Sequence, residues 1–85
     1  MEKKPVGKIT HYFSKIGVAV VELSDKIRTG DRIVIEGSEA GPVEQTVDSM
    51  QIEHKDVNEA TKGQSIGMKV ASKVHPSNMV YKICD

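Results

Sequence analysis

The stretch Leu23–Gly37, LSDKIRTGDRIVIEG, carries the clearest structural pattern in this 85-residue chain. Ile27 is a lone apolar position, and residues 29–31, Thr-Gly-Asp, predict a tight turn. The glycine of this turn can take a positive φ, and its aspartate can accept hydrogen bonds from nearby backbone amides. The residues that follow, Arg32–Glu36, are mainly β-branched and apolar, which predicts a short strand ending before the second glycine. We expect the remaining strands to be arranged around this turn.

Length and composition indicate one small domain with a single core. A chain of this size buries only about 60–65% of its unfolded surface. Its 12 Lys and Arg residues balance 12 Asp and Glu residues. This balance argues against a surface that grips nucleic acid on all sides, but it allows one basic face. Val and Ile dominate the apolar residues, which favours sheet over helix.

The chain is expected to divide into a flexible N-terminal tail, residues 1–5, and a single β-barrel domain, residues 6–85. Cys84 is the only cysteine, so no internal disulfide can form, which fits a reducing cytosol. No apolar run is long enough to span a bilayer, and the N-terminus lacks the apolar stretch of a signal peptide. We therefore expect a cytoplasmic protein that does not contact membranes.

Apolar runs and turn residues predict six strands, at residues 6–13, 16–23, 31–36, 43–54, 65–70 and 79–83. In the fourth of these, the apolar positions change parity between Val47 and Met50. Since each step along a strand flips the face, a bulge or bend near residues 48–49 is needed to bury both. Asp56–Lys62 predicts one helical turn, because an aspartate can cap it and a glycine follows it.

Strand order follows from what joins the strands. No segment is long enough for the crossover helices that parallel strands require, so the strands are expected to be mainly antiparallel. Short strands leave exposed edges unless the sheet closes. We therefore predict an all-β fold, a small closed six-stranded antiparallel Greek-key barrel with at most one short helical turn.

Four segments share the pattern of a known barrel domain: Val6–Ile9 with Gly17–Val21, Ile27–Gly37, Val47–Gln51 and Ala60–Met68. They resemble the second domain of translational GTPases such as elongation factor Tu, and the resemblance runs from about Val6 to Ile83. It implies a closed barrel, here free-standing and elongation factor-like, that contacts tRNA or ribosomal RNA. The chain departs from this pattern at residues 75–78, where relatives often repeat Gly-Asp. A shorter resemblance runs to the C-terminal barrel of collagenase-like peptidases.

Motifs for nucleotide binding and catalysis are missing. The Gly-Lys pair at residues 7–8 lies too near the N-terminus for a P-loop, so we expect no bound GTP and no cofactor. Cys84 lies next to an aspartate near the end of the chain, an unfavourable setting for a nucleophilic thiolate, so we expect no catalytic residue and no enzyme. Asp25 and Asp31 flank the turn and are explained by capping.

Metal binding is also not expected. The side chains that could bind a soft metal are spread along the chain, at His11, His54, His75 and Cys84. None of them form a close pair of the kind found in zinc sites, so we predict no metal centre.

Side chains on the outer faces of strands are the remaining candidates for a binding surface. The predicted RNA-binding residues are Lys8, Tyr12, Lys62, Lys69, Lys73 and Lys82. The lysines would contact phosphates, and the tyrosine could stack on a base. The lysines form one patch if the first, fifth and last predicted strands adjoin. The alternative is that scattered lysines keep the barrel wall soluble and protect strand edges.

The sequence thus predicts a non-enzymatic, translation-factor-like binding module without its own GTPase. Its expected partner is tRNA or ribosomal RNA, held by a lysine-bearing face. A second interpretation is an adaptor that offers a groove or a strand edge of the barrel to another protein, such as one related to translation.

Overall fold

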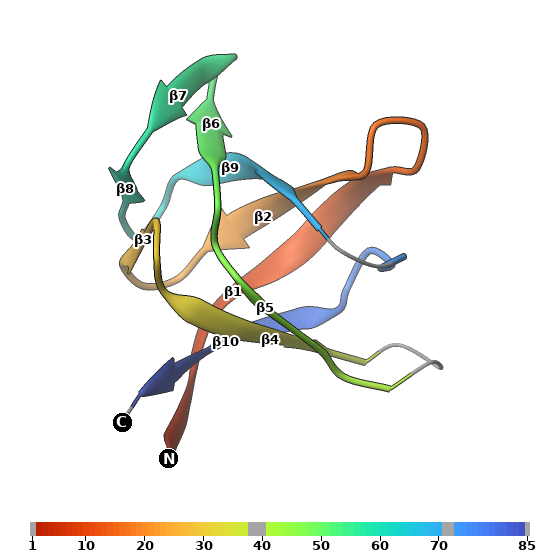
Figure 1. The fold of residues 1–85 in the computed structure, drawn as a ribbon, viewed down its shortest axis with the longest axis vertical. Coiled ribbons are helices and arrows are strands. Elements are labelled where there is room, and N and C mark those ends of the chain that lie inside the picture. Colours follow the sequence, from red (N-terminus) through yellow and green to blue (C-terminus); the bar gives the residue numbers. More distant parts are fainter. Residues whose placement is uncertain (1, 38–40, 71–72, 85) are drawn as a thin grey trace.

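The computed structural model describes residues 2–37, 41–70 and 73–84, and these residues form ten strands and no helix (Figure 1). The strands are β1 (Glu2–Phe13), β2 (Val18–Leu23), β3 (Ile27–Arg28), β4 (Arg32–Glu36), β5 (Val43–Thr46), β6 (Met50–Ile52), β7 (Lys55–Val57), β8 (Glu59–Ala60), β9 (Ser65–Lys69) and β10 (Met79–Cys84). In this part of the chain, no helix is long and apolar enough to cross a membrane.

Eight of the strands form one sheet in the order β5-β4-β10-β1-β2-β9-β6-β7, and β3 pairs with β8 in a separate two-stranded sheet. Each pair is antiparallel. The large sheet curls strongly around the core and forms a half-barrel (Figure 1). Right-handed twist and two register shifts in β1, between Pro5 and Gly7 and between Ile9 and His11, account for this curl.

The prediction of an all-β, mainly antiparallel fold is confirmed, but the closed six-stranded barrel is wrong. The sheet ends at β5 on one side and β7 on the other, and no ladder of the described residues joins these two strands. The predicted strand 43–54 is two strands, β5 at one end of the sheet order and β6 next to the strand at the other end. The bend between them carries the chain across the open side of the half-barrel.

The predicted helical turn at Asp56–Lys62 is also wrong, because this segment contains β7 and β8. Glu53 and His54 have φ values of 51° and 65°, and Ile52 pairs with Lys55 on either side of them. Two consecutive positive φ values are typical of the type I′ turn that joins hairpin strands. The turn folds β7 back onto β6, so strand pairing overrides the local helix signal.

The first strand begins earlier than the sequence predicts. β1 starts at Glu2, and Glu2–Pro5, which the sequence assigns to a tail, pair with the last residues of β10. The division into a flexible tail and one domain stays a prediction. This pairing places the beginning of β1 beside the end of β10 (Figure 1).

The core lies inside the curl of the sheet. It contains Val6, Ile9, Ala19, Val21, Leu23, Ile27, Ile33, Ile35, Val47, Met50, Ala60, Ile66, Met68, Val74 and Val80. Val47 and Met50 are both 1% exposed, although their positions differ in parity. The chain bends at residues 47–49 between β5 and β6, which confirms the bend that the sequence predicts.

The second register shift in β1 changes which side chains face the core. Ile9 is buried, but beyond the shift Tyr12 packs against the core, whereas His11 and Phe13 are exposed. The expectation that Tyr12 points outward is therefore wrong. The rings of His11 and Phe13 stack on the outer surface, with centroids 6.4 Å apart. An extra residue at a bulge inverts the alternation of every position after it.

The turn at residues 29–31 has the predicted geometry. Gly30 has a φ of 92°, and Asp31 Oδ2 accepts a hydrogen bond of 2.9 Å from the backbone amide of Arg28. The backbone amide of Val47 donates to Asp31 O, and Gly30 N donates to Val47 O, each at 2.9 Å. These bonds fix the turn to the bend between β5 and β6, and they hold β3 at the end of the half-barrel.

Candidate functional site

A polar pocket of about 290 Å³ opens where β3 approaches the beginning of β1 and the end of β10. We call it the corner pocket, and its lining residues are Lys4, Val6, Asp25, Lys26, Arg28 and Lys82. Four of these side chains are cationic, and one is a carboxylate. The corner pocket is therefore the place where positive charge converges on this fold.

Strand geometry explains why these cations meet. Lys26 and Arg28 flank the buried Ile27, so alternation turns both away from the core. Lys4 of β1 lies directly opposite Lys82 of β10 in the ladder. Residues opposite each other in an antiparallel pair share a face, and two like charges there repel each other. Neighbouring carboxylates offset this repulsion.

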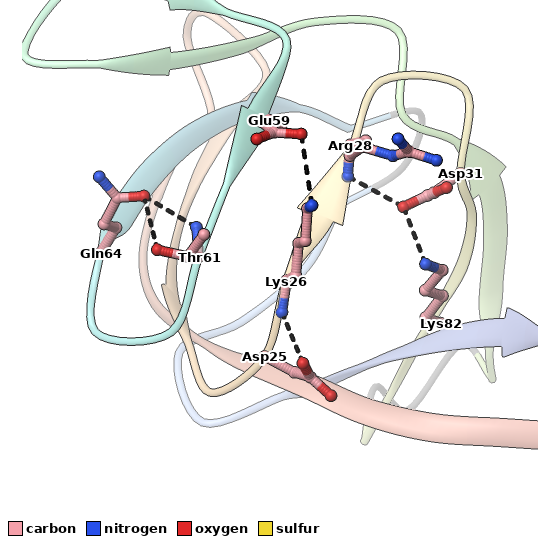
Figure 2. A network of polar contacts seen from close by, with 8 residues as sticks. All are labelled: Asp25, Lys26, Arg28, Asp31, Glu59, Thr61, Gln64 and Lys82. Carbon is pink, nitrogen blue, oxygen red and sulfur yellow. Dashed lines mark hydrogen bonds and ion pairs between the residues drawn. The ribbon is translucent and has the colours of Figure 1, made fainter.

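Three ion pairs border the corner pocket, two of which Figure 2 shows. They join Lys4 Nζ to Asp25 Oδ2 at 2.9 Å, Lys82 Nζ to Asp31 Oδ2 at 3.3 Å, and Lys26 Nζ to Glu59 Oε2 at 3.6 Å. With Arg28, the four cations and three carboxylates leave one excess positive charge at neutral pH. The lining can therefore attract an anion. The ion pairs themselves are exposed, and such pairs add little to the stability of the fold.

The cations of the corner pocket act on Asp25. A hydrogen bond from the side chain of Lys4 lowers the pKa of this carboxyl below its ordinary value of 3.8, and the backbone amide of Lys26 and the charge of Lys82 lower it further. The backbone hydrogen bond, Lys26 N to Asp25 Oδ1, is 2.7 Å long. The contacts with Lys4 and Lys26 therefore favour the ionised form of Asp25.

We expect Asp25→Asn to lower the melting temperature slightly at pH 7 and to have no effect in strong acid. The folded-state pKa of Asp25 lies below 3.8, so its ionised form stabilises the fold above pH 3.8, and this contribution disappears as the pH falls through the folded-state pKa. Melting curves of both proteins across this range measure the difference. Asp48→Asn, at an exposed carboxylate elsewhere, is the control. A difference that grows with acidity would contradict the expectation.

A second hollow, of about 310 Å³, is mainly apolar and lies between the β1–β2 turn and the β6–β7 turn. Phe13 and Ile16 form one wall and are 51% and 61% exposed. Val18, Val20 and Gly67 also line it. We call this hollow the hairpin groove, and its chemistry suits an apolar side chain.

The predicted RNA-binding residues lie on strands that do not all adjoin. Lys8, Lys62, Lys69 and Lys73 are exposed, Tyr12 is half-buried against the core, and Lys82 pairs with Asp31. β1 adjoins β10, but β9 lies on the far side of β2. The strand adjacency under which the sequence predicts one patch is therefore not present. RNA contact by individual residues of this set stays a prediction.

Within the described part of the chain, no group of three or more His, Cys, Asp or Glu side chains is arranged to hold a metal ion. The side chain of Cys84 and all of Asp85 lie outside the described residues. The predictions that involve this cysteine as a ligand or nucleophile therefore have no structural test.

Sequence reasoning missed three of the cations of the corner pocket. Lys4 falls in the predicted tail, and its position opposite β10 depends on long-range pairing. Lys26 and Arg28 could have been predicted to share an outer face, because these two basic residues flank the buried Ile27 just before the turn. Only Lys82 of this lining was among the predicted binding residues.

Comparison with known proteins points to peptidases. No family model matches the chain. The chain is 40% identical over 79 residues to an uncharacterised protease of Methanocaldococcus jannaschii, which covers 93% of this chain and 19% of that protein. It is 43% identical over 82 residues to a collagenase of Porphyromonas gingivalis, which covers 95% of this chain and 23% of the collagenase. The chain thus spans about a fifth of the length of these relatives.

A solved structure has a similar fold over almost the whole of this chain. It is the C-terminal domain of a protein assigned to the U32 peptidases in Geobacillus thermoleovorans, with a TM-score of 0.89 and 24% identity over 95% of this chain and 93% of that domain. This chain has the fold of that U32 domain. At this identity the likeness establishes the fold, and the sequence relatives carry the functional comparison.

These comparisons correct the main functional predictions. The relatives are proteins named protease and collagenase, so the assignment to translational GTPases is wrong, and so is the translation-factor module derived from it. The prediction that the chain is not an enzyme is contradicted for the same reason, because the relatives carry the names protease and collagenase. The adaptor interpretation gains no support from them. The shorter resemblance, to the barrel of collagenase-like peptidases, is the one that agrees with these relatives.

Proposed function

We propose that this chain works as part of a proteolytic enzyme, as the β-domain of a U32-type peptidase. The observation that carries this proposal is the identity of 40% to a protease and 43% to a collagenase across nearly all of the chain. The fold of a U32 C-terminal domain supports it. Because the chain covers about a fifth of those relatives, the rest of such an enzyme would supply other parts of the proteolytic machinery.

The two hollows give such a domain its means of acting on peptides. The hairpin groove is apolar and lies between two turns, and the corner pocket is cationic and lies at the end of the half-barrel. Peptides offer apolar side chains to the first and acidic groups to the second. The role we propose is therefore to position a peptide chain relative to the rest of the enzyme.

A chimera tests this proposal. In the Porphyromonas gingivalis collagenase, the 82 matching residues are replaced by the aligned part of this chain, and a second version lacks the segment. We expect the deletion to lose about tenfold or more of the hydrolysis of gelatin, because substrate positioning contributes at least this much to many enzymes. We expect the chimera to recover most of the lost activity.

The control carries an unrelated β-domain of similar size in the same place. Circular dichroism and gel filtration establish that each version is folded. A folded chimera no more active than this control would overturn the proposal, as would a deletion that retains full activity.

Placement in the cytoplasm also stays a proposal. It is supported by the single cysteine of the sequence, which fits a reducing compartment. Cell fractionation with an antibody against the chain tests it, and recovery from the medium or the cell envelope would overturn it.

A further inference from the structure

The corner pocket has more hydrogen-bond donors than its carboxylates can accept. Lys26 and Lys82 each form an ion pair with a carboxylate, and an ammonium group has three N–H donors that point in different directions. A guanidinium adds a rigid set of N–H donors. The lining itself contains a single carboxylate, that of Asp25. An oxyanion in the pocket would use the remaining donors.

Arg28 is the cation best placed to bind such a group. Its backbone amide donates to Asp31, while its guanidinium extends from β3 separately from this bond (Figure 2). No carboxylate among the described residues pairs with this guanidinium. A planar guanidinium can donate two parallel hydrogen bonds to one carboxylate, which a lysine cannot do.

We propose that the corner pocket binds the carboxylate end of a peptide, with Arg28 as the bidentate donor and with Lys4, Lys26 and Lys82 supplying positive charge around it. The excess of one positive charge matches a monoanionic carboxylate better than a dianionic phosphate. The volume of about 290 Å³ leaves room for the residue that bears the carboxylate. The choice of a peptide as the source rests on the proposed peptidase function.

Asp25 shows how the cations of the pocket act on a carboxylate. Its pKa is lowered by Lys4 and, at longer range, by Lys82, so an anionic group at this position is already stabilised by the cations of the pocket. A ligand carboxylate near the same cations would experience a similar potential. The Asp25 carboxylate in turn limits the affinity, because it competes for Lys4.

The test uses the ¹⁵N-labelled chain and two acetylated dipeptides that differ only at the C-terminus, one a free acid and one an amide. We expect the free acid to shift the backbone resonances of Lys26, Arg28 and Asp31 in a saturable way, with a dissociation constant on the order of 1 mM. We expect the amide to cause no such shifts. Equal binding of the acid and the amide, or no binding of either, would overturn the proposal.

Variants test the role of the guanidinium. Arg28→Gln keeps the backbone amide that bonds to Asp31, and we expect it to weaken binding of the free acid about tenfold or more. Arg28→Lys keeps the charge but loses the bidentate geometry, and we expect an intermediate affinity. Lys15→Gln removes an exposed charge in the β1–β2 turn and is the matched control, with wild-type binding expected. Wild-type affinity in Arg28→Gln, with an unchanged spectrum of the folded protein, would overturn the assignment of Arg28.

Titrations with inorganic phosphate and with acetate distinguish a peptide carboxylate from other oxyanions as the ligand of the pocket. We expect acetate to compete weakly with the free-acid peptide, and we expect higher salt to weaken all binding. Phosphate binding more tightly than the peptide would overturn the carboxylate assignment. The gelatin assay of the chimera is independent of these titrations. An active chimera without peptide binding refutes the pocket alone, and an inactive chimera with peptide binding refutes the peptidase role alone.

Discussion

Ile27→Ala is expected to lower the free energy of unfolding by about 3 kcal/mol, within the usual range for buried aliphatic truncations. The side chain of Ile27 is 1% exposed and belongs to the core cluster. It is also the residue through which β3 pairs with Ala60 of β8. The loss is large for this chain, because a domain of 85 residues has a total stability of about 4–13 kcal/mol.

Urea unfolding followed by circular dichroism measures this change. Ile16→Ala removes the same atoms at a position that is 61% exposed, and we expect it to change stability by less than about 0.5 kcal/mol. Equal effects of the two substitutions would show that Ile27 does not anchor the turn to the core.

Gly7→Ala is expected to cost about 2–3 kcal/mol, for the opposite reason that an atom is added where there is no space. A Cβ at this position would lie 2.7 Å from Val21 Cγ1 and 2.8 Å from the backbone oxygen of Glu22. The valine side chain is in the core and the oxygen belongs to the paired strand β2, so neither can move without disturbing the sheet. The glycine is required here because β1 and β2 approach closely at the first bulge.

Gly67→Ala provides the matched control, since it makes the same substitution in another strand of the same sheet. Its Cβ would meet Val18 Cγ1 at 3.5 Å, an ordinary contact. We expect a loss of less than about 1 kcal/mol, or a small gain from the lower entropy of the unfolded chain. Thermal and urea unfolding of both variants measure the contrast. A Gly7→Ala protein as stable as Gly67→Ala would contradict the close approach of the two strands.

The functional error has a physical origin. The turn, the bent strand and the alternating apolar residues describe how a small sheet curls around a core, and unrelated proteins can share that requirement. The same segments therefore resembled a translation-factor barrel and a peptidase barrel at once. Identity over nearly the whole chain separates the two, whereas strand patterns do not.

The sequence alone allows only part of the corner pocket to be predicted. Lys26 and Arg28 lie on either side of a buried residue, and alternation alone predicts that they share a face. Lys4 and Lys82 are far apart in sequence, and they meet because β1 pairs with β10 from its first residues. No local signal marks that pairing, since Glu2–Pro5 are polar or turn-forming residues with little strand preference.

By itself, the sequence determined the turn at residues 29–31, the strand after it and the bend between Val47 and Met50. Each of these follows from local backbone preference or from the requirement that apolar side chains alternate. Tertiary structure alone decided the open half-barrel, the β6–β7 hairpin at Glu53 and His54, and the inverted face of Tyr12. The half-barrel depends on which distant strands pair, whereas the hairpin and the face of Tyr12 depend on where a turn or a bulge sets the register of neighbouring strands.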